Sequence, residues 1–143
     1  MRIGMMGFAV VFAMGLLAGS TWQTHAAQTR NDPACGAAST PQVRTTLYFG
    51  TSRPKGSVSE LEWQLFLRDE VTPRFPAGLT VWDAHGQWQS QGAIGHERTK
   101  VLLLVHADAP AARESVQAVI NRYRKAFDQE SVLWETARVC AVN

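Results

Sequence analysis

The chain has 143 residues, of which 45% are hydrophobic, and a formal net charge of +2. This length is sufficient for one domain with a substantial core. A nearly neutral charge balance, without a block of like charges, argues against nucleic acid as a partner.

The first 26 residues have the features of a secretory signal peptide. Arg2 precedes an apolar run at residues 3–18, and Thr24-His25-Ala26 provides small residues for cleavage before Ala27. The run is too short to be a stable membrane span. We therefore expect residues 1–26 to be removed, leaving 13 basic and 12 acidic residues, no membrane span after cleavage, and a periplasmic or secreted location.

The next segment, residues 27–42, is polar and rich in small residues, and we expect a flexible N-terminal arm followed by a single α+β domain at residues 43–143. Cys35 and Cys140 lie near the two ends of the mature chain. An even pair of cysteines in an exported protein indicates a disulfide, and two free thiols are the alternative. The absence of a Cys-x-x-Cys motif argues against a thioredoxin-like redox role.

The first half of the domain is predicted as strand, loop and helix. Residues 45–50 form the strand, and residues 51–58 lack the spacing of a phosphate-binding loop, so we expect a solvated loop there. Ser59 and Glu62 have the spacing of a capping box at the start of a helix. The main apolar face of that helix is Trp63, Phe66, Leu67 and Val71, and Leu61 and Leu65 predict a second buried stripe.

A corner and a hairpin are expected after this helix. Pro73 should move Thr72 out of the α region and end the helix near Val71. Gly78 can adopt a positive φ before a strand at residues 79–83. Ala84-His85-Gly86 predicts a three-residue hairpin loop with Gly86 in the left-handed region, which would place Trp82 opposite Trp88.

The remaining elements complete a β-α-β-β-α-β order. Residues 97–106 are apolar on both faces, as in a central strand covered on both sides. Asp108 is the expected cap of a second helix, Pro110 lies in its first turn, and residues 131–142 form the last strand. This order predicts a ferredoxin-like α+β sandwich in which a four-stranded antiparallel sheet, in the order 4-1-3-2, carries both helices on one face.

The segments TLYFG, TPRFPAGLTVWDAHGQW and QESV give the chain its resemblance to a known family. From about Val43 to Val142 it resembles domain-of-unknown-function family 3574, small exported bacterial proteins that are often predicted lipoproteins. The resemblance implies export and one shared domain, and no catalytic residue is implied. Ser20 stands where lipidated relatives would carry cysteine, which argues against membrane anchoring.

Two polar clusters are candidate sites. Strand directions place Glu97 and Glu130 at one end of the sheet with Tyr48, His96 and Gln129, a set suited to acid–base chemistry or to a cationic ligand; solvated charge is the alternative. The other end gathers Arg74, His106 and Asp108. Arg74 can hold a carboxylate bidentately, or it can pin the corner to an internal carboxylate or to backbone carbonyls.

Metal binding and cofactor binding are not expected, because His85, His96 and His106 lack the spacing of a zinc site. We expect a non-catalytic module that binds a small ligand or an envelope protein. The alternative is a small enzyme on a dimeric α+β scaffold, with Glu97 and a neighbouring residue as acid and base. Because the central strand is apolar on both faces, we also expect a homodimer through the helix-free face of the sheet, unless the N-terminal arm covers that face.

Overall fold

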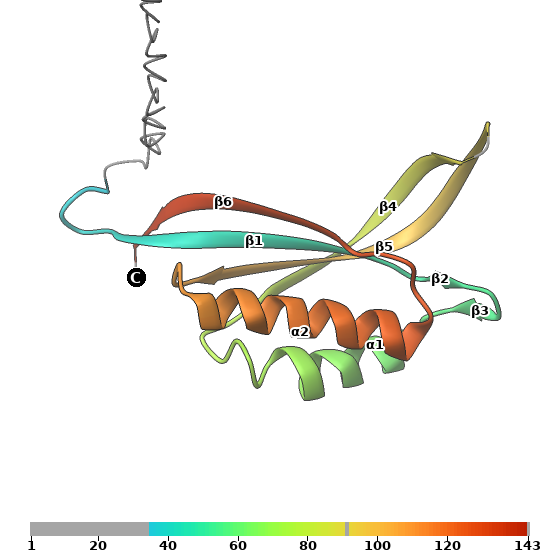
Figure 1. Cartoon of the computed structure of the whole chain (residues 1–143), viewed down its shortest axis with the longest axis horizontal. Coiled ribbons are helices and arrows are strands. Elements are labelled where there is room, and N and C mark those ends of the chain that lie inside the picture. Colours follow the sequence, from blue (N-terminus) through green and yellow to red (C-terminus); the bar gives the residue numbers. More distant parts are fainter. Residues whose placement is uncertain (1–34, 91, 143) are drawn as a thin grey trace, which may run out of the picture. The chain divides into compact units, whose positions relative to one another are not determined.

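The computed structural model describes residues 35–90 and 92–142, so the expected signal peptide and residues 27–34 of the expected arm lie outside the described residues (Figure 1). In chain order the elements are β1 (Thr40–Gly50), β2 (Ser52–Arg53), β3 (Gly56–Ser57), α1 (Glu60–Phe66), the π-helix η1 (Leu67–Val71), β4 (Thr80–Ser90), β5 (Ala93–His106), α2 (Pro110–Phe127) and β6 (Leu133–Ala141). No helix among the described residues is long and apolar enough to cross a membrane.

The main sheet has four antiparallel strands in the order β4-β5-β1-β6. Both helices lie on one face of it (Figure 1). The predicted α+β architecture and the predicted strand order are confirmed. β1 begins at Thr40, which pairs with Ala141, so residues 40–42 belong to the sheet rather than to the expected arm.

An aromatic cluster fills the space between the sheet and the helices. Phe49 is fully buried, and its ring centroid lies 5.3 Å from that of Trp63 and 4.5 Å from that of Tyr123. The Tyr123 hydroxyl donates to the Gly50 carbonyl oxygen at 2.9 Å. The predicted second stripe of α1 is wrong, because Leu61 is 70% exposed and Leu65 is 38% exposed. The helix therefore contributes one buried face to the core.

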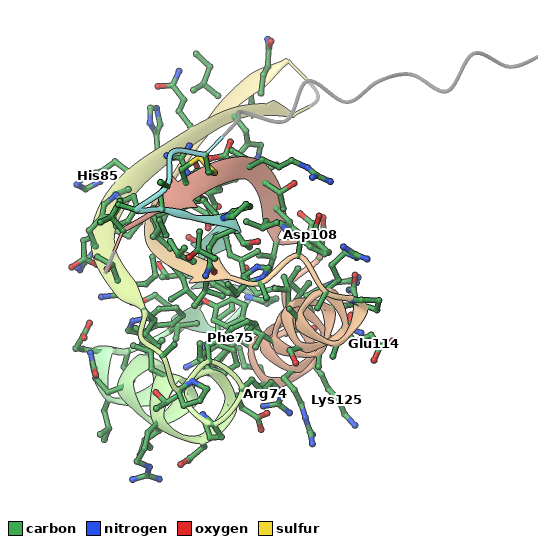
Figure 2. All side chains as sticks on the ribbon, turned by 90° about the vertical axis from the view of Figure 1, so that its left-hand side faces the viewer. Arg74, Phe75, His85, Asp108, Glu114 and Lys125 are labelled. Atoms are coloured by element: carbon green, nitrogen blue, oxygen red, sulfur yellow. A yellow bond between two sulfur atoms is a disulfide. The ribbon has the colours of Figure 1, made fainter. Side chains whose placement is uncertain are left out.

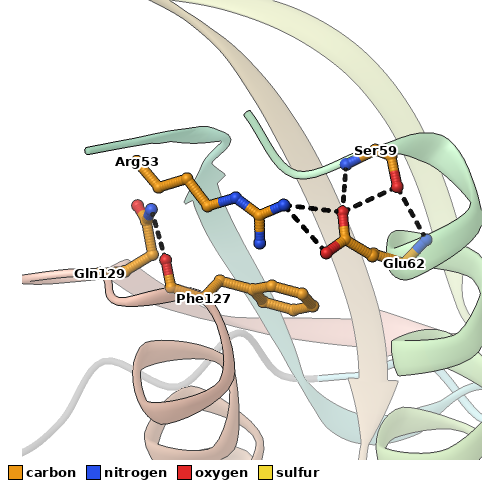
Figure 3. A network of polar contacts seen from close by, with 5 residues as sticks. All are labelled: Arg53, Ser59, Glu62, Phe127 and Gln129. Atoms are coloured by element: carbon orange, nitrogen blue, oxygen red, sulfur yellow. Dashed lines mark hydrogen bonds and ion pairs between the residues drawn. The ribbon is translucent and has the colours of Figure 1, made fainter. Parts of the chain in front are cut away.

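The predicted capping box at the start of α1 is confirmed (Figure 3). The Ser59 hydroxyl accepts from the Glu62 backbone N–H, and Glu62 Oε2 accepts from the Ser59 backbone N–H at 2.8 Å. Arg53 Nη2 donates to both Glu62 carboxylate oxygens, at 2.9 and 3.1 Å. These hydrogen bonds, that of the Ser59 backbone first, lower the pKa of Glu62 from 4.5 to about 2. The network fastens the β2–β3 loop to the helix.

The second helix begins differently from the prediction. Its N-cap is Ala109, which provides no side-chain hydrogen bond, and Pro110 is the first helical residue. Asp108 binds Arg113 Nη1 at 2.5 Å and Arg138 Nη2 at 3.0 Å instead. Two arginines compete successfully for the carboxylate that would have capped the helix.

The predicted three-residue hairpin loop at residues 84–86 is wrong. β4 and β5 pair continuously from Thr80 and Leu103 to Ser90 and Ala93, and Gly92 in the turn has a φ of 83°. Trp82 therefore lies opposite Val101, and Trp88 lies opposite Gly95. The long ladder of strand pairing outweighs the local turn preference of the residues around Gly86.

Gly86 is required for space rather than for a turn. It has no positive φ, but a Cβ built on it would lie 2.8 Å from Thr99 Oγ1. Beyond Thr99, which pairs with Gly50, β5 pairs among the described strands with β4, and the Arg98 carbonyl oxygen still accepts from the Thr51 N–H at 3.0 Å. We call residues 85–90 and 93–98 the hairpin arm, which extends past the helices (Figure 1).

The expected cysteine pair is brought together at the other end of the sheet. The Sγ atoms of Cys35 and Cys140 lie 2.06 Å apart and their Cα atoms 5.5 Å apart, across a sequence separation of 105 residues. The bond links the segment before β1 to the C-terminal end of the edge strand β6.

Candidate functional site

A groove of about 820 Å³ opens at the end of the sheet where β4 begins. Its walls come from the corner before β4, the end of β5 and the start of α2. The lining residues are Gln42, Arg74, Phe75, Pro76, Ala77, Gly78, Leu79, Thr80, Leu103, Val105, His106, Ala107, Ala109, Ala111, Ala112, Ser115 and Ala141. The volume falls within the usual range of small-molecule sites, about 300–1,000 Å³.

The corner that forms one wall is tied back to η1. The Thr72 N–H donates to the Leu67 carbonyl oxygen at 2.9 Å, and the Phe75 N–H donates to the Val71 carbonyl oxygen at 3.0 Å. The helix ends at Val71 as predicted, but Thr72 retains αR angles, with φ −55° and ψ −42°, despite the following proline. Gly78, at φ 128°, then turns the chain into β4.

His106 forms a fixed part of the opposite wall. Its Nδ1 lies 2.9 Å from the Ala107 carbonyl oxygen, and its Nε2 lies 2.9 Å from the Thr45 hydroxyl. Because a carbonyl oxygen only accepts, Nδ1 donates, and in the neutral ring Nε2 accepts from Thr45. The Phe75 ring packs 5.8 Å from the imidazole, centroid to centroid. Both ring nitrogens are engaged, so His106 shapes the groove rather than offering a free base.

Arg74 supplies positive charge at the groove. Its Nη1 donates to the Glu70 backbone carbonyl oxygen, and also to Glu70 Oε2 at 2.9 Å. Glu70 Oε2 lies 3.6 Å from Arg122 Nε as well, so these three side chains carry one net positive charge. The sequence-based alternative, in which Arg74 pins the corner to a carboxylate and a carbonyl, describes these contacts.

The predicted cluster of Arg74, His106 and Asp108 is brought together only in part. Arg74 and His106 both line the groove, whereas Asp108 is not in the lining and binds Arg113 and Arg138. Figure 2 shows Asp108 well apart from Arg74 and Phe75.

The other predicted cluster reduces to one contact point. Glu97 and Gln129 meet at Ser52, whose N–H donates to Glu97 Oε2 at 3.3 Å and whose carbonyl oxygen accepts from Gln129 Nε2 at 2.6 Å. These contacts connect β2 to β5 on one side and to the residues that follow α2 on the other.

The remaining members of that cluster lie elsewhere. Tyr48 donates to Glu135 Oε1 at 3.1 Å, and this hydrogen bond raises the tyrosine pKa. His96 pairs with Gln87 in the hairpin arm, and Glu130 is exposed after α2. No group of three metal-ligating side chains occurs among the residues that the structure describes.

One charged group was missed by the sequence analysis. Lys100 is 7% exposed, and its Nζ lies 2.5 Å from Glu60 Oε2 and 2.7 Å from Asp83 Oδ1. Burial lowers the pKa of Lys100, but the two carboxylates outweigh that effect and raise it. The lysine is therefore kept charged and joins α1 to β4, which makes it unsuitable as a nucleophile. A lone lysine directly before the apolar run of β5 was its sequence signal.

The order of the elements and the order of the strands define a two-layer α+β domain of the ferredoxin-like class. The chain belongs to the family described as "Protein of unknown function (DUF3574)", which it matches over residues 44–142. No curated protein matches the chain.

The chain is similar in structure to solved proteins at low sequence identity. A phage SAM lyase in complex with S-methyl-5′-thioadenosine is 15% identical, with a TM-score of 0.52 over 76% of this chain and 93% of that chain. The same enzyme class in the apo state is 14% identical, with a TM-score of 0.51 over 72% and 90%. CutA from Synechococcus elongatus is 16% identical, with a TM-score of 0.44 over 73% and 80%.

Proposed function

We propose that this protein is an exported, non-catalytic binding module whose small-molecule ligand occupies the groove beside the corner. The observation that supports this proposal is the groove itself, which combines a wall of apolar side chains with Arg74 in its lining. A concave apolar site with a few polar groups is the usual form of a small-molecule site. His106 has both ring nitrogens engaged, which favours binding over proton transfer.

Native mass spectrometry of the purified protein tests this proposal. We expect the native protein to carry a bound small molecule. Ala111→Trp fills the groove from α2 and should remove the ligand, whereas Ala126→Trp changes another exposed alanine of α2 outside the lining and should leave it bound. An equal ligand content in the two variants, or a native protein without bound ligand, would contradict the proposal.

Export is part of the proposal and rests on the apolar run after Arg2 and on the cleavage sequence at residues 24–26. Intact mass of the protein from an envelope fraction should correspond to a chain that begins at Ala27. Cytoplasmic protein that retains its first 26 residues would contradict export.

We further propose that a second copy of this chain covers the helix-free face of the sheet. Trp82 and Leu133 share that face outside the groove lining and are 44% and 64% exposed. Val105, 40% exposed on the same face, also lines the groove. An apolar surface of this kind is typical of an interface, and a two-fold dimer is its commonest form. The competing account remains the N-terminal arm as an internal cover.

Light scattering separates the two accounts. The native protein should be a dimer, and Leu133→Lys should dissociate it. Leu61→Lys is the matched control, because Leu61 is 70% exposed on α1, on the helix side of the sheet. A native monomer at high micromolar concentration would exclude the dimer and favour the N-terminal arm as the cover of this face.

A small enzyme is the second candidate, and the position of Glu97 supports it. A Cβ on Gly50 would lie 2.5 Å from Glu97 Oε2, and the Gly50 carbonyl oxygen accepts from the buried Tyr123 hydroxyl, so a carboxylate and a phenol converge on Gly50. Glu97 lies at the end of the sheet opposite the groove, so the test needs a small molecule that stays bound to Ala111→Trp, incubated with native protein and with Glu97→Gln. A mass change of the ligand with native protein alone would favour the enzyme. The likeness to a SAM lyase is a likeness of fold and supports no substrate for this chain.

A further inference from the structure

The groove has an uneven distribution of charge. Among the described residues that line it, Arg74 and His106 are the titratable side chains, and no carboxylate belongs to the lining. Phe75, Leu79, Leu103 and Val105 provide apolar walls, and alanines at the start of α2 keep the groove wide. A molecule that fits here must bury an apolar body and find its polar partner at Arg74.

The guanidinium of Arg74 is held in place for such a partner. Its two contacts with Glu70 both use Nη1, so they leave the Nε and Nη2 donors of this lining residue uncommitted within the described part of the chain. Its side chain is 28% exposed. A planar guanidinium whose rotamer is already restrained loses less entropy when it pairs bidentately with a carboxylate.

The charge of Arg74 is not cancelled by its neighbours. Glu70 is shared with Arg122, and Asp108, the nearest acidic residue in sequence to the start of α2, is shared between Arg113 and Arg138. Each of these two carboxylates is therefore outnumbered by arginines, and Glu70 does not neutralise Arg74 fully. The first turn of α2 contains no acidic residue, so its partial positive charge adds to this field without creating the site.

From this we propose that the ligand of the groove is an organic carboxylate with an apolar body, whose carboxylate binds Arg74. The inference rests on the proposed function and specifies its ligand class. A cationic ligand would have no carboxylate in the lining to pair with, and a neutral apolar ligand would leave the guanidinium edge without a polar partner.

Calorimetry with three probes of equal chain length tests the inference. The probes are octanoate, octanamide and octylammonium. We expect octanoate to bind the native protein at least about tenfold tighter than octanamide, which is the effect of one charge-assisted hydrogen-bonded pair. Octylammonium should bind more weakly than both.

Variants identify the residue responsible. Arg74→Gln should reduce octanoate affinity to that of octanamide, and retained octanamide binding shows that the groove is intact. Arg74→Lys keeps the charge without the planar fork and should give an intermediate affinity. Arg68→Gln removes one positive charge from an exposed arginine of η1, which pairs with Asp69, and should change neither affinity.

The outcomes separate the ligand class from the groove. Octanamide binding equal to octanoate binding, or an unchanged octanoate preference in Arg74→Gln, overturns the carboxylate assignment while the groove stands. A native protein that binds no octanoate also overturns the assignment. If Ala111→Trp leaves the binding of every probe unchanged, the ligand site is elsewhere and the proposed function fails with it.

Discussion

The two faces of the sheet are built from the same strands but differ in how they are covered. On the helix side Phe49, Leu102 and Leu104 are at most 1% exposed. On the helix-free side Val105 and Leu133 are 40% and 64% exposed. Successive residues of β5 point to opposite faces, and residues 101–105 are all valine or leucine. The two faces of this strand are therefore similarly apolar.

This comparison shows that strand composition does not determine burial on its own. Val101 lies on the helix-free face, yet it is 1% exposed, because Trp82 and Tyr48 flank it on the neighbouring strands. A side chain with a partner on each neighbouring strand is covered by them, whereas Val105, beyond the last β4–β5 pair, and Leu133, on the edge strand, need a packed element or a partner.

The largest expected effect is on the helix side. Phe49→Ala should destabilise the protein by about 3–5 kcal/mol, because it leaves a cavity among the rings of Trp63, Phe66 and Tyr123. Trp82→Ala on the other face should cost about 1 kcal/mol or less in the monomer. Urea unfolding of dilute protein measures both. Equal costs would mean that the helix-free face is covered within one chain, and the comparison would fail.

The disulfide should have the next largest effect, and it should act independently of either face. Cys140→Ser removes a link across 105 residues of sequence, which mainly frees the unfolded chain. A loss of about 2–4 kcal/mol is expected. The thermal midpoint with and without reductant measures it, and native material with two thiols open to alkylation would show that the bond does not form.

A smaller effect is expected where two strands approach closely on the helix-free face. Gly86→Ala should destabilise by about 1–3 kcal/mol, since the new Cβ would lie 2.8 Å from Thr99 Oγ1. His85→Ala, at an exposed neighbouring position, is the control. The same urea midpoint for both variants would show that the strands separate without cost.

The smallest expected effect is the contribution of the Glu62 carboxylate, at the start of α1, to the pH dependence of stability. The pKa of Glu62 is lowered from 4.5 to about 2 in the folded protein. Its stabilising contribution is therefore present above the unfolded pKa and is lost as pH falls from about 4.5 to about 2. Glu62→Gln should flatten the fall in urea midpoint over this range, and Glu114→Gln, an exposed carboxylate of α2, should retain it. An identical acid limb in native protein and Glu62→Gln would exclude this role.

The sequence was sufficient for features that depend on near neighbours and chain order. Ser59 and Glu62 are three residues apart, and their capping box forms as predicted. The sheet order follows from the sequence of elements and from right-handed crossovers. Both kinds of prediction use rules that act without knowledge of distant residues.

The errors arose where distant residues decided the outcome. Asp108 has the chemistry of an N-cap, but Arg138 lies thirty residues further along and binds it. Gly86 has the chemistry of a turn, but pairing with Glu97 keeps it in a strand. The groove could not be predicted because Arg74, Leu103 and Ala111 lie in three elements whose approach depends on the whole fold.

The hairpin arm has a consequence for how the protein opens locally. Among the described strands, residues 93–98 pair with β4, over roughly 20 Å at the usual rise per residue, and Arg98 and Glu97 at the base of this segment also contact Thr51 and Ser52. Amide protons of the hairpin arm can therefore exchange with solvent when this two-stranded ribbon frays. The amide protons of Leu102 and Leu47, at the centre of the sheet, require cooperative unfolding. One long strand, β5, thus belongs to two units of different exchange protection, and the boundary between them lies near Thr99.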